Sequence, residues 1–346
     1  MKFSNFLFPE SRNPADDGRT IQETIEEARL SDSLGFDTIW LAEHHFDGIC
    51  AYVDPVSFAA ALAPAIKRAR IGFAVAQMSL HHPVRFAEQM ALLDNLLHGR
   101  LIIGLGRGTA YNIYDYRGYD IDPDEAQERL EESEAILHAT WTGERVEHKG
   151  RFWTLHIPML RPRPFSAYPP ILRAASGEDS MLGFARQGRP FMMNVQSLET
   201  TARRIHAYRN ALAESGYSER HVAGCLEDTW VWRNVFVAET DAEAERIAVP
   251  AFDAMQQHRK AMRERVFAET GARLAHAAVA APAHTQREHS LICGSPATVA
   301  EKLMPLKHLG VGGVILQFRL GPMPHQDAAN SLRLFADAVR PMIGGR

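Results

Sequence analysis

Short apolar runs alternate with longer amphipathic stretches along most of this chain. Each apolar run has the length of a β-strand, and the stretches between them repeat apolar residues at the three- and four-residue spacing of a helix. This pattern predicts eight strands, at residues 3–8, 38–42, 70–78, 101–105, 170–175, 191–195, 229–238 and 311–318. It predicts helices at 18–34, 55–67, 83–98, 124–141, 178–187, 199–215, from 241 onward, at 296–309 and at 328–339.

The regular alternation of strands and helices indicates a parallel α/β fold. Eight repeats without a change of composition between the halves favour a single closed (β/α)8 TIM barrel over residues 1–346. An open, doubly wound sheet is the alternative. A closed barrel places its active site at the carboxyl ends of the strands, and an open sheet places its ligand site there too.

Two insertions interrupt the alternation. Residues 143–169, before the fifth strand, contain Trp153 and several prolines, and we expect a small hairpin followed by a rigid loop. Residues 271–290, between the seventh and eighth strands, combine small residues with three histidines. That composition fits a mobile lid over the site, and a disordered surface loop is the alternative.

Composition and charge narrow the classes of function. The chain has 346 residues, a net charge of -4 and no lysine- or arginine-rich run, so neither nucleic acid nor an anionic membrane is an expected partner. Cys50, Cys225 and Cys293 are far apart and odd in number, which argues against a disulfide framework and favours the cytoplasm. No stretch approaches the ~18 apolar residues of a spanning helix, and the apolar start is too short for a signal peptide.

The most informative polar cluster ends the second strand. Glu43, His44 and His45 directly follow its apolar residues, where three titratable side chains are costly unless they are paired or used. Neighbouring side chains on a strand point to opposite faces, so we expect the two histidines to point in different directions. One would enter the barrel mouth as a general base, and the other would pair with Glu43.

Two glycine- and serine-containing turns are candidates for binding a phosphate. Arg107 lies in a glycine-rich segment, residues 104–108, after the fourth strand, and its guanidinium can bind a phosphate with two hydrogen bonds. A dinucleotide fingerprint is excluded because the position of its third glycine is Thr109 and residues 111–114 do not look like a tight helix start. Ser176 and Ser180 flank a predicted helix N-terminus, which attracts anions or is simply capped.

Two further sequence features can be explained by structure as well as by function. The small, apolar third strand, which includes Ala74 and Val75, can support a flat ring, although core packing explains it equally well. His81 and His82 suggest a metal site together with His44, but adjacent histidines point apart and His82 precedes the proline that starts a helix. We therefore expect no metal.

Together these stretches resemble the bacterial luciferase-like flavin-dependent monooxygenases, in particular the alkanal monooxygenase α chains. The matching segments are GFDTIWLAEHHF at 35–46, HHPVRFAEQMALLDNLLHGRLIIGLGRG at 81–108 and PPILRAASGEDS at 169–180. The resemblance implies a barrel enzyme that receives reduced FMN (FMNH2) from a separate flavin reductase. The bound flavin reacts with O2 to give a C4a-(hydro)peroxide, which oxygenates a small organic substrate such as an aldehyde or ketone. It also implies a homodimer.

The resemblance also assigns roles to individual residues. His44 matches the active-site histidine, and Arg107 matches the arginine that holds the flavin phosphate. A non-prolyl cis peptide beside the flavin ring is implied at Ala74-Val75. The other positions implied to contact FMN are Phe6, Glu43, Asn112, Ser176, Gly177 and Ser180.

One departure limits what the resemblance implies. The luciferase α chain has a cysteine at the position of Gly106, so light emission is not expected. Two other functions fit the same barrel: hydride transfer that depends on the deazaflavin F420, and a non-catalytic partner subunit like the luciferase β chain. The presence of both His44 and Arg107 argues against the non-catalytic subunit. The substrate itself is not identified by the residues.

Overall fold

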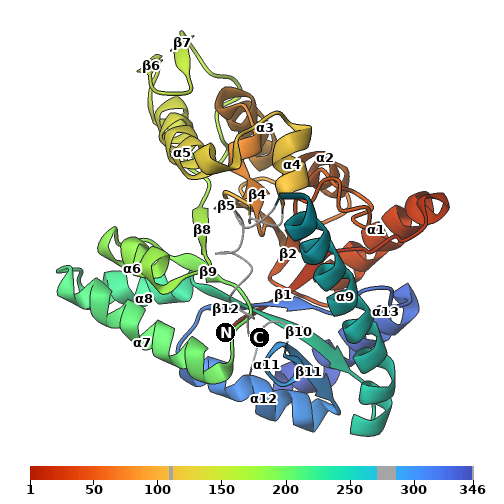
Figure 1. Ribbon diagram of the computed structural model, residues 1–346. Helices are drawn as coiled ribbons and strands as arrows, with labels where there is room; N and C mark the ends of the chain where they lie inside the picture. The colour runs from red at the N-terminus through yellow and green to blue at the C-terminus, as the bar shows by residue number, and fades with distance from the viewer. Residues whose placement is uncertain (109–111, 271–285, 345–346) are drawn as a thin grey trace.

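A closed parallel barrel forms the centre of the computed structural model, which describes residues 1–108, 112–270 and 286–344. Eight strands pair side by side: β1 (Lys2–Leu7), β2 (Thr38–Leu41), β3 (Arg70–Phe73), β5 (Leu101–Gly106), β8 (Ile171–Ala175), β9 (Phe191–Met193), β10 (Trp230–Val237) and β12 (Gly313–Gln317). Because β10 pairs with β9 on one side and β12 on the other, the ring closes (Figure 1). The predicted TIM barrel is therefore confirmed, and the open sheet is wrong.

Helices surround this barrel as the amphipathic stretches predict. They include α1 (Asp17–Ser33), α2 (Pro55–Leu62), α3 (Pro83–Leu96), α5 (Ala126–Thr142), α6 (Glu178–Arg186), α7 (Leu198–Glu214), α9 (Asp241–Thr270), α12 (Pro296–His308) and α13 (His325–Leu334). Start signals in the sequence act as expected. The Asp54 side chain accepts hydrogen bonds from two backbone N–H groups of α2, with Pro55 at the first helical position. No helix in the described ranges is long and apolar enough to cross a membrane.

Several elements differ from the prediction. The third strand stops at Phe73 because the Ala74–Val75 peptide is cis, and the chain resumes as β4 (Ala76–Gln77), which pairs with β5. The expected hairpin exists as β6 (Val146–Lys149) and β7 (Thr154–Ile157). The elements that were not predicted include α4 (Ile113–Gly118), α8 (Glu219–Glu227), α11 (Arg287–Ser290), β11 (Leu291–Gly294) and α14 (Arg340–Ile343). The last turns of the helix predicted at 328–339 form a π-helix (Phe335–Val339).

The lid predicted at 271–290 falls mainly outside the described residues, since 271–285 are not described. Its last residues form the short helix α11, which leads into β11. β11 pairs with the carboxyl half of β10, beyond the point where β9 ends. This end of the predicted insertion is therefore regular structure and not a loop.

Aromatic side chains fill the lower part of the barrel interior. Trp40 from β2 and Trp230 from β10 meet edge to face with ring centroids 5.2 Å apart, and the Trp40 indole N–H donates to Ser4 Oγ at 2.9 Å. A Cβ on Gly313 would lie 2.2 Å from the Trp230 ring, so only glycine leaves room for that ring. Because this floor is packed, a ligand must enter from the carboxyl ends of the strands.

Candidate active site

The predicted site residues all lie at or just beyond the carboxyl ends of neighbouring strands. Phe6 is in β1, Glu43 and His44 follow β2, Ala74–Val75 joins β3 to β4, Arg107 follows β5, Asn112 precedes α4, Ser176 and Gly177 join β8 to α6, and Ser180 is in the first turn of α6. Their strands are consecutive around the barrel. The fold thus gathers these residues along one arc of the mouth, and their contacts divide them into two groups.

The first group is a buried hydrogen-bonded network around Glu43. Its carboxylate lies 3.0 Å from His45 Nε2 and 2.9 Å from His81 Nε2, and it accepts from the Gln77 backbone N–H at 2.5 Å. Burial opposes ionisation of Glu43, but the charge of His81 and these hydrogen bonds outweigh it and lower its pKa to about 2. In turn, Glu43 overcomes the effect of burial on the two imidazoles and raises the pKa of both.

Further polar residues extend this network to the short helix α4. The Gln77 side-chain amide donates to the Glu43 carbonyl at 3.1 Å and to Asp115 at 2.7 Å. Asp115 also accepts from the Asn112 amide at 3.0 Å, and burial raises its pKa. The Tyr119 hydroxyl lies 3.4 Å from His45 Nδ1. The network therefore ties β2, β4 and α4 into one rigid corner of the mouth.

His44 lies outside this network, as the alternation of side chains predicted. Its side chain is 32% exposed, compared with 8% for His45. Its Nδ1 is 3.6 Å from Asp47 Oδ2, and its ring meets the Phe8 ring edge to face at 5.0 Å. Of the two adjacent histidines, His44 is the one that a ligand in the mouth can reach.

The second group begins with the loop at Arg107. Hydrogen bonds fix the backbone of this residue, whereas its side chain is exposed. The Arg107 carbonyl accepts from Ser79 Oγ at 2.8 Å and from the Tyr116 hydroxyl. Gly108 has a φ of +83°, and a Cβ there would lie 2.3 Å from Gln77 Oε1. The guanidinium is exposed and has no hydrogen-bond or ion-pair partner within the described ranges. The loop thus presents a cation from a fixed backbone.

Two small apolar residues, Ala74 and Val75, lie beside this loop and are half-buried. The peptide bond between Ala74 and Val75 is cis, as the family resemblance implied. A Cβ at Gly106 would approach Val75 Cγ2 to 2.6 Å. In this chain, a cysteine at 106 would collide with Val75, which accounts for the glycine at this departure from the luciferase pattern.

The start of α6 completes the second group. Gly177 is its N-cap residue and supplies no side chain to cap the helix, so the N–H groups of the first turn receive no side-chain cap. Ser176 and Ser180 are exposed. Glu178 in the first turn forms an ion pair with Arg203 of α7, which neutralises that carboxylate, whereas Asp179, the other acid of this turn, is exposed. This helix end can therefore bind a phosphate.

The two anion-binding features are on adjacent strands. β5 and β8 pair in parallel with Leu105 opposite Arg173, so Arg107 and Ser176 follow neighbouring strand ends. The Ala74–Val75 surface adjoins Gly106 on the other side. A flavin mononucleotide, with one phosphate and one flat ring, suits this donor set. Over the residues that the structure describes, no group of three histidine, cysteine or acidic side chains is arranged to hold a metal.

Sequence reasoning missed much of the network. His81 was considered only as a metal ligand, whereas it is an ionic partner of Glu43. Gln77, Asp115, Ser79 and Tyr116 received no role, because their contacts depend on loops that only the fold brings together. The one available signal in the sequence was Asp115, an acidic residue in a segment rich in aromatic residues.

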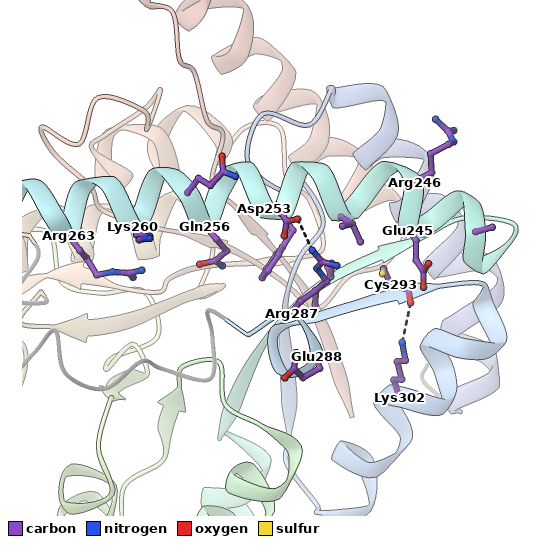
Figure 2. Close-up of a pocket in the computed structure, with 15 residues that line it drawn as sticks. Glu245, Arg246, Asp253, Gln256, Lys260, Arg263, Arg287, Glu288, Cys293 and Lys302 are labelled. Carbon is purple, nitrogen blue, oxygen red and sulfur yellow. Dashed lines mark hydrogen bonds and ion pairs between the residues drawn. The ribbon is translucent and has the colours of Figure 1, made fainter.

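A separate groove lies between α9, α11, β11 and α12, with a volume of about 1060 Å³ (Figure 2). Charged side chains of both signs line it, and Arg287 pairs with Asp253 at 2.7 Å across it. None of the predicted site residues borders this groove. It is therefore distinct from the barrel mouth described above.

Comparisons with known proteins agree with this geometry. The family model described as luciferase-like monooxygenase matches residues 1–312. Limonene 1,2-monooxygenase from Rhodococcus erythropolis is 34% identical over 166 residues, 48% of this chain and 42% of that protein. The chain spans about half the length of the curated relatives it matches.

Two solved structures share the whole fold. The monooxygenase RslO1 from Streptomyces bottropensis has a TM-score of 0.81 and 27% identity, over 99% of both chains. The oxygenating constituent of 3,6-diketocamphane monooxygenase from Pseudomonas putida, solved in complex with FMN, has a TM-score of 0.78 and 22% identity, over 99% of this chain and 98% of that one.

Proposed function

The chain belongs to the luciferase-like monooxygenase family, and from this premise we propose that it is the oxygenase component of a two-component system. It would use reduced FMN and O2 to oxygenate a small organic substrate. One observation carries this proposal: the exposed guanidinium of Arg107 follows β5, and the uncapped start of α6 follows the neighbouring strand β8. Both features favour a phosphate group, and the apolar Ala74–Val75 segment beside them favours a ring.

The residues of the mouth divide the work of holding the cofactor. Arg107 and the first turn of α6, with the Ser176 and Ser180 hydroxyls and the Gly177 backbone, would bind the phosphate. The ring would lie on Ala74–Val75. Phe6, Glu43 and Asn112 would border it, with Glu43 held in place by its two imidazole partners. Reduced flavin, when bound, supplies the reaction with O2.

His44 would act on a proton in this site. Its Nδ1 lies 3.6 Å from the Asp47 carboxylate, which would favour a proton on Nδ1 and leave Nε2 as the acceptor. Nε2 would then take or return a proton at the substrate or flavin. The stacked rings of Phe6 and Phe8, with centroids 6.3 Å apart, exclude water on the same side.

A separate flavin reductase is the proposed partner. The glycine-rich loop of this chain departs from a dinucleotide fingerprint at Thr109, so reduction by a nicotinamide is assigned to another protein. The FMN-containing structural neighbour is likewise named as an oxygenating constituent. Reduced FMN would then reach the mouth by diffusion.

Anaerobic titration tests the cofactor assignment directly. Reduced FMN and reduced F420 are each titrated into the protein, and we expect binding of FMN and none of F420. Tight F420 binding would instead support hydride transfer on the same barrel. Failure to bind any reduced flavin would support the non-catalytic partner subunit.

A His44→Ala variant tests the proton role. With reduced FMN, 18O2 and a panel of aldehydes, cyclic ketones, terpenes and phenols, we expect 18O incorporation to fall about 100-fold, within the range for loss of a general base. The dissociation constant for reduced FMN should change less than about threefold. Equal losses of both would assign His44 to binding and not to proton transfer.

A further inference from the structure

Three polar atoms inside the barrel lack hydrogen-bond partners in the described part of the chain. They are the indole nitrogen of Trp232, Asn234 Oδ1 and Gln317 Oε1, each of which is buried. Asn234 and Gln317 are themselves 1% and 0% exposed. Leaving a buried polar group unpaired costs about 1–3 kcal/mol, so three in one place call for an explanation.

The sheet register brings these three residues together. Trp232 and Asn234 are two residues apart on β10, and Asn234 is directly opposite Gln317 on β12. Alternate residues of β10 point outward into the helices, as Val231 and Val235 do. All three side chains therefore point into the barrel, above the packed Trp40–Trp230 floor.

Existing hydrogen bonds fix how the two amides point. Asn234 Nδ2 donates to the Ser290 carbonyl at 2.9 Å, and Gln317 Nε2 donates to the Arg319 carbonyl at 3.0 Å. Because both NH2 groups are used, the two amide oxygens are left as acceptors. With the Trp232 N–H as donor, the cluster presents one donor and two acceptors.

This cluster lies on the side of the mouth opposite the proposed phosphate site. The residues assigned to FMN are on β1 to β8, whereas β10 and β12 carry none of them. Phe6 connects the two sides, because its ring centroid is 4.8 Å from that of Trp232. Trp232 is only partly buried, so it forms the boundary between the cluster and the open mouth.

We propose that Trp232, Asn234 and Gln317 bind the polar end of the organic substrate, which is a ring compound bearing an O–H or a secondary amide N–H group. This inference rests on the proposed function. A hydroxyl accepts from the indole N–H and donates its single hydrogen to one of the two amide oxygens. Phe6 and Trp232 supply the aromatic faces for the ring. A pure hydrocarbon would leave all three atoms unpaired and is rejected.

Phenol and toluene form a matched pair of probes for this site. Protein labelled with 5-fluorotryptophan gives a 19F resonance for Trp232, which the Trp232→Phe variant identifies. We expect phenol to shift this resonance at a concentration at least about tenfold lower than toluene does, a difference of about 1.4 kcal/mol. Equal responses to the two probes, or no response to saturating phenol, would overturn the proposal.

Two variants remove the acceptors one at a time. In at least one of Asn234→Leu and Gln317→Leu, the one whose oxygen accepts from phenol, we expect the preference for phenol to fall below about threefold. Gln127→Leu, which changes an exposed amide on α5, should keep the full preference. If both Asn234→Leu and Gln317→Leu keep the preference for phenol, ordered water, and not a ligand, pairs the two amide oxygens.

A third variant guards against misfolding of the leucine variants. Trp232→Phe keeps one aromatic ring and removes the indole N–H together with the second ring, and ligand-observed saturation-transfer NMR measures its phenol preference. We expect that preference to fall at least threefold below wild type, and an unchanged value would oppose the proposal. Binding of reduced FMN is measured separately, so that a failure of the flavin assignment and a failure of this site give different results.

Discussion

The two groups of polar residues at the barrel mouth differ in whether their charged and hydrogen-bonding atoms have partners within the protein. Around Glu43, the carboxylate and His45 are buried, His81 is half-buried, and both imidazoles pair with the carboxylate. Around Arg107 and the start of α6, the guanidinium and the serine hydroxyls are exposed, and the helix start has no side-chain cap. One group is complete within the protein, and the other is open to a ligand.

This difference indicates that the Glu43 network shapes the site, whereas the Arg107 group binds a ligand within it. The lowest carboxyl pKa at the mouth belongs to Glu43, and a strongly perturbed group is often taken as catalytic. Here the perturbation reflects pairing inside a closed network, which holds β2, β4 and α4 together. The groups that we assign to ligand contact, His44 and Arg107, are the accessible ones. Variants in the two groups should therefore fail in different ways.

The largest expected effect comes from neutralising the carboxylate in Glu43→Gln. The change leaves the buried His45 and the half-buried His81 without their counter-charge, and breaking a buried pair typically costs about 3–5 kcal/mol. We expect the free energy of unfolding in urea to fall by about that amount. A loss of flavin binding with unchanged stability would place Glu43 in the open group instead.

An exposed carboxylate gives the matched control. Glu147 on β6 also pairs with an imidazole, His156, and with Arg145, but all three side chains are more than half exposed. Exposed pairs contribute little because water and salt screen them. Glu147→Gln should leave the unfolding curve unchanged. Equal destabilisation by both variants would mean that burial is not what distinguishes the network.

The pH dependence of stability should follow from the same network. The pKa of Glu43 is lowered from 4.5 to about 2, so its contribution is present above pH 4.5 and is lost as the pH falls toward 2, amounting to about 3 kcal/mol. His45 and His81 have raised pKa values, so their contribution is present below pH 6.5 and is lost as the pH rises through the raised values.

Urea unfolding from about pH 3 to about pH 9 measures this dependence. We expect stability to decline toward both ends in the wild type, and both slopes to be shallower in Glu43→Gln. A stability curve that is the same in the two proteins would show that the three groups do not titrate together.

The same contrast explains what could be predicted from the sequence. The eight barrel strands are apolar runs whose period and length are local properties, and all eight exist. Helix α1 buries Thr24 and Glu27, whereas its apolar Ile21 and Ile25 are only partly buried. The reason is non-local: Asn5 on β1 donates to Glu27 Oε1 at 3.0 Å, so the helix turns a polar face to the barrel.

For the site, strand-end residues could be identified, but their partners could not. Glu43, His44 and Arg107 are adjacent to strands that the pattern predicts. His81 joins the Glu43 network from a loop far along the chain, and Asp115 joins it from α4, a six-residue helix that is too short to have a clear period. Local patterns therefore identified the open group better than the closed one.

Removing the open cation in Arg107→Ala should weaken flavin binding without affecting the fold. A charge-assisted hydrogen bond is worth about 1.5–3 kcal/mol, so the dissociation constant for FMN should rise about 10- to 150-fold. The urea midpoint should not move, because the guanidinium has no partner among the described residues. Arg85→Ala, an exposed arginine on α3, is the control. An unchanged FMN affinity would remove the phosphate assignment.

The smallest effect is expected for Ser176→Ala, and it tests whether the start of α6 belongs to the same phosphate site as Arg107. One neutral hydroxyl contributes about 0.5–1.5 kcal/mol, so FMN affinity should fall about 2- to 12-fold. If both residues contact one phosphate, the double variant should lose less or more than the sum of the single losses, because groups that share a partner are not additive. Riboflavin, which lacks the phosphate, should bind wild type and both variants equally. Additive losses, or a loss of riboflavin binding, would separate Ser176 from Arg107 and leave the open group as two unrelated surfaces.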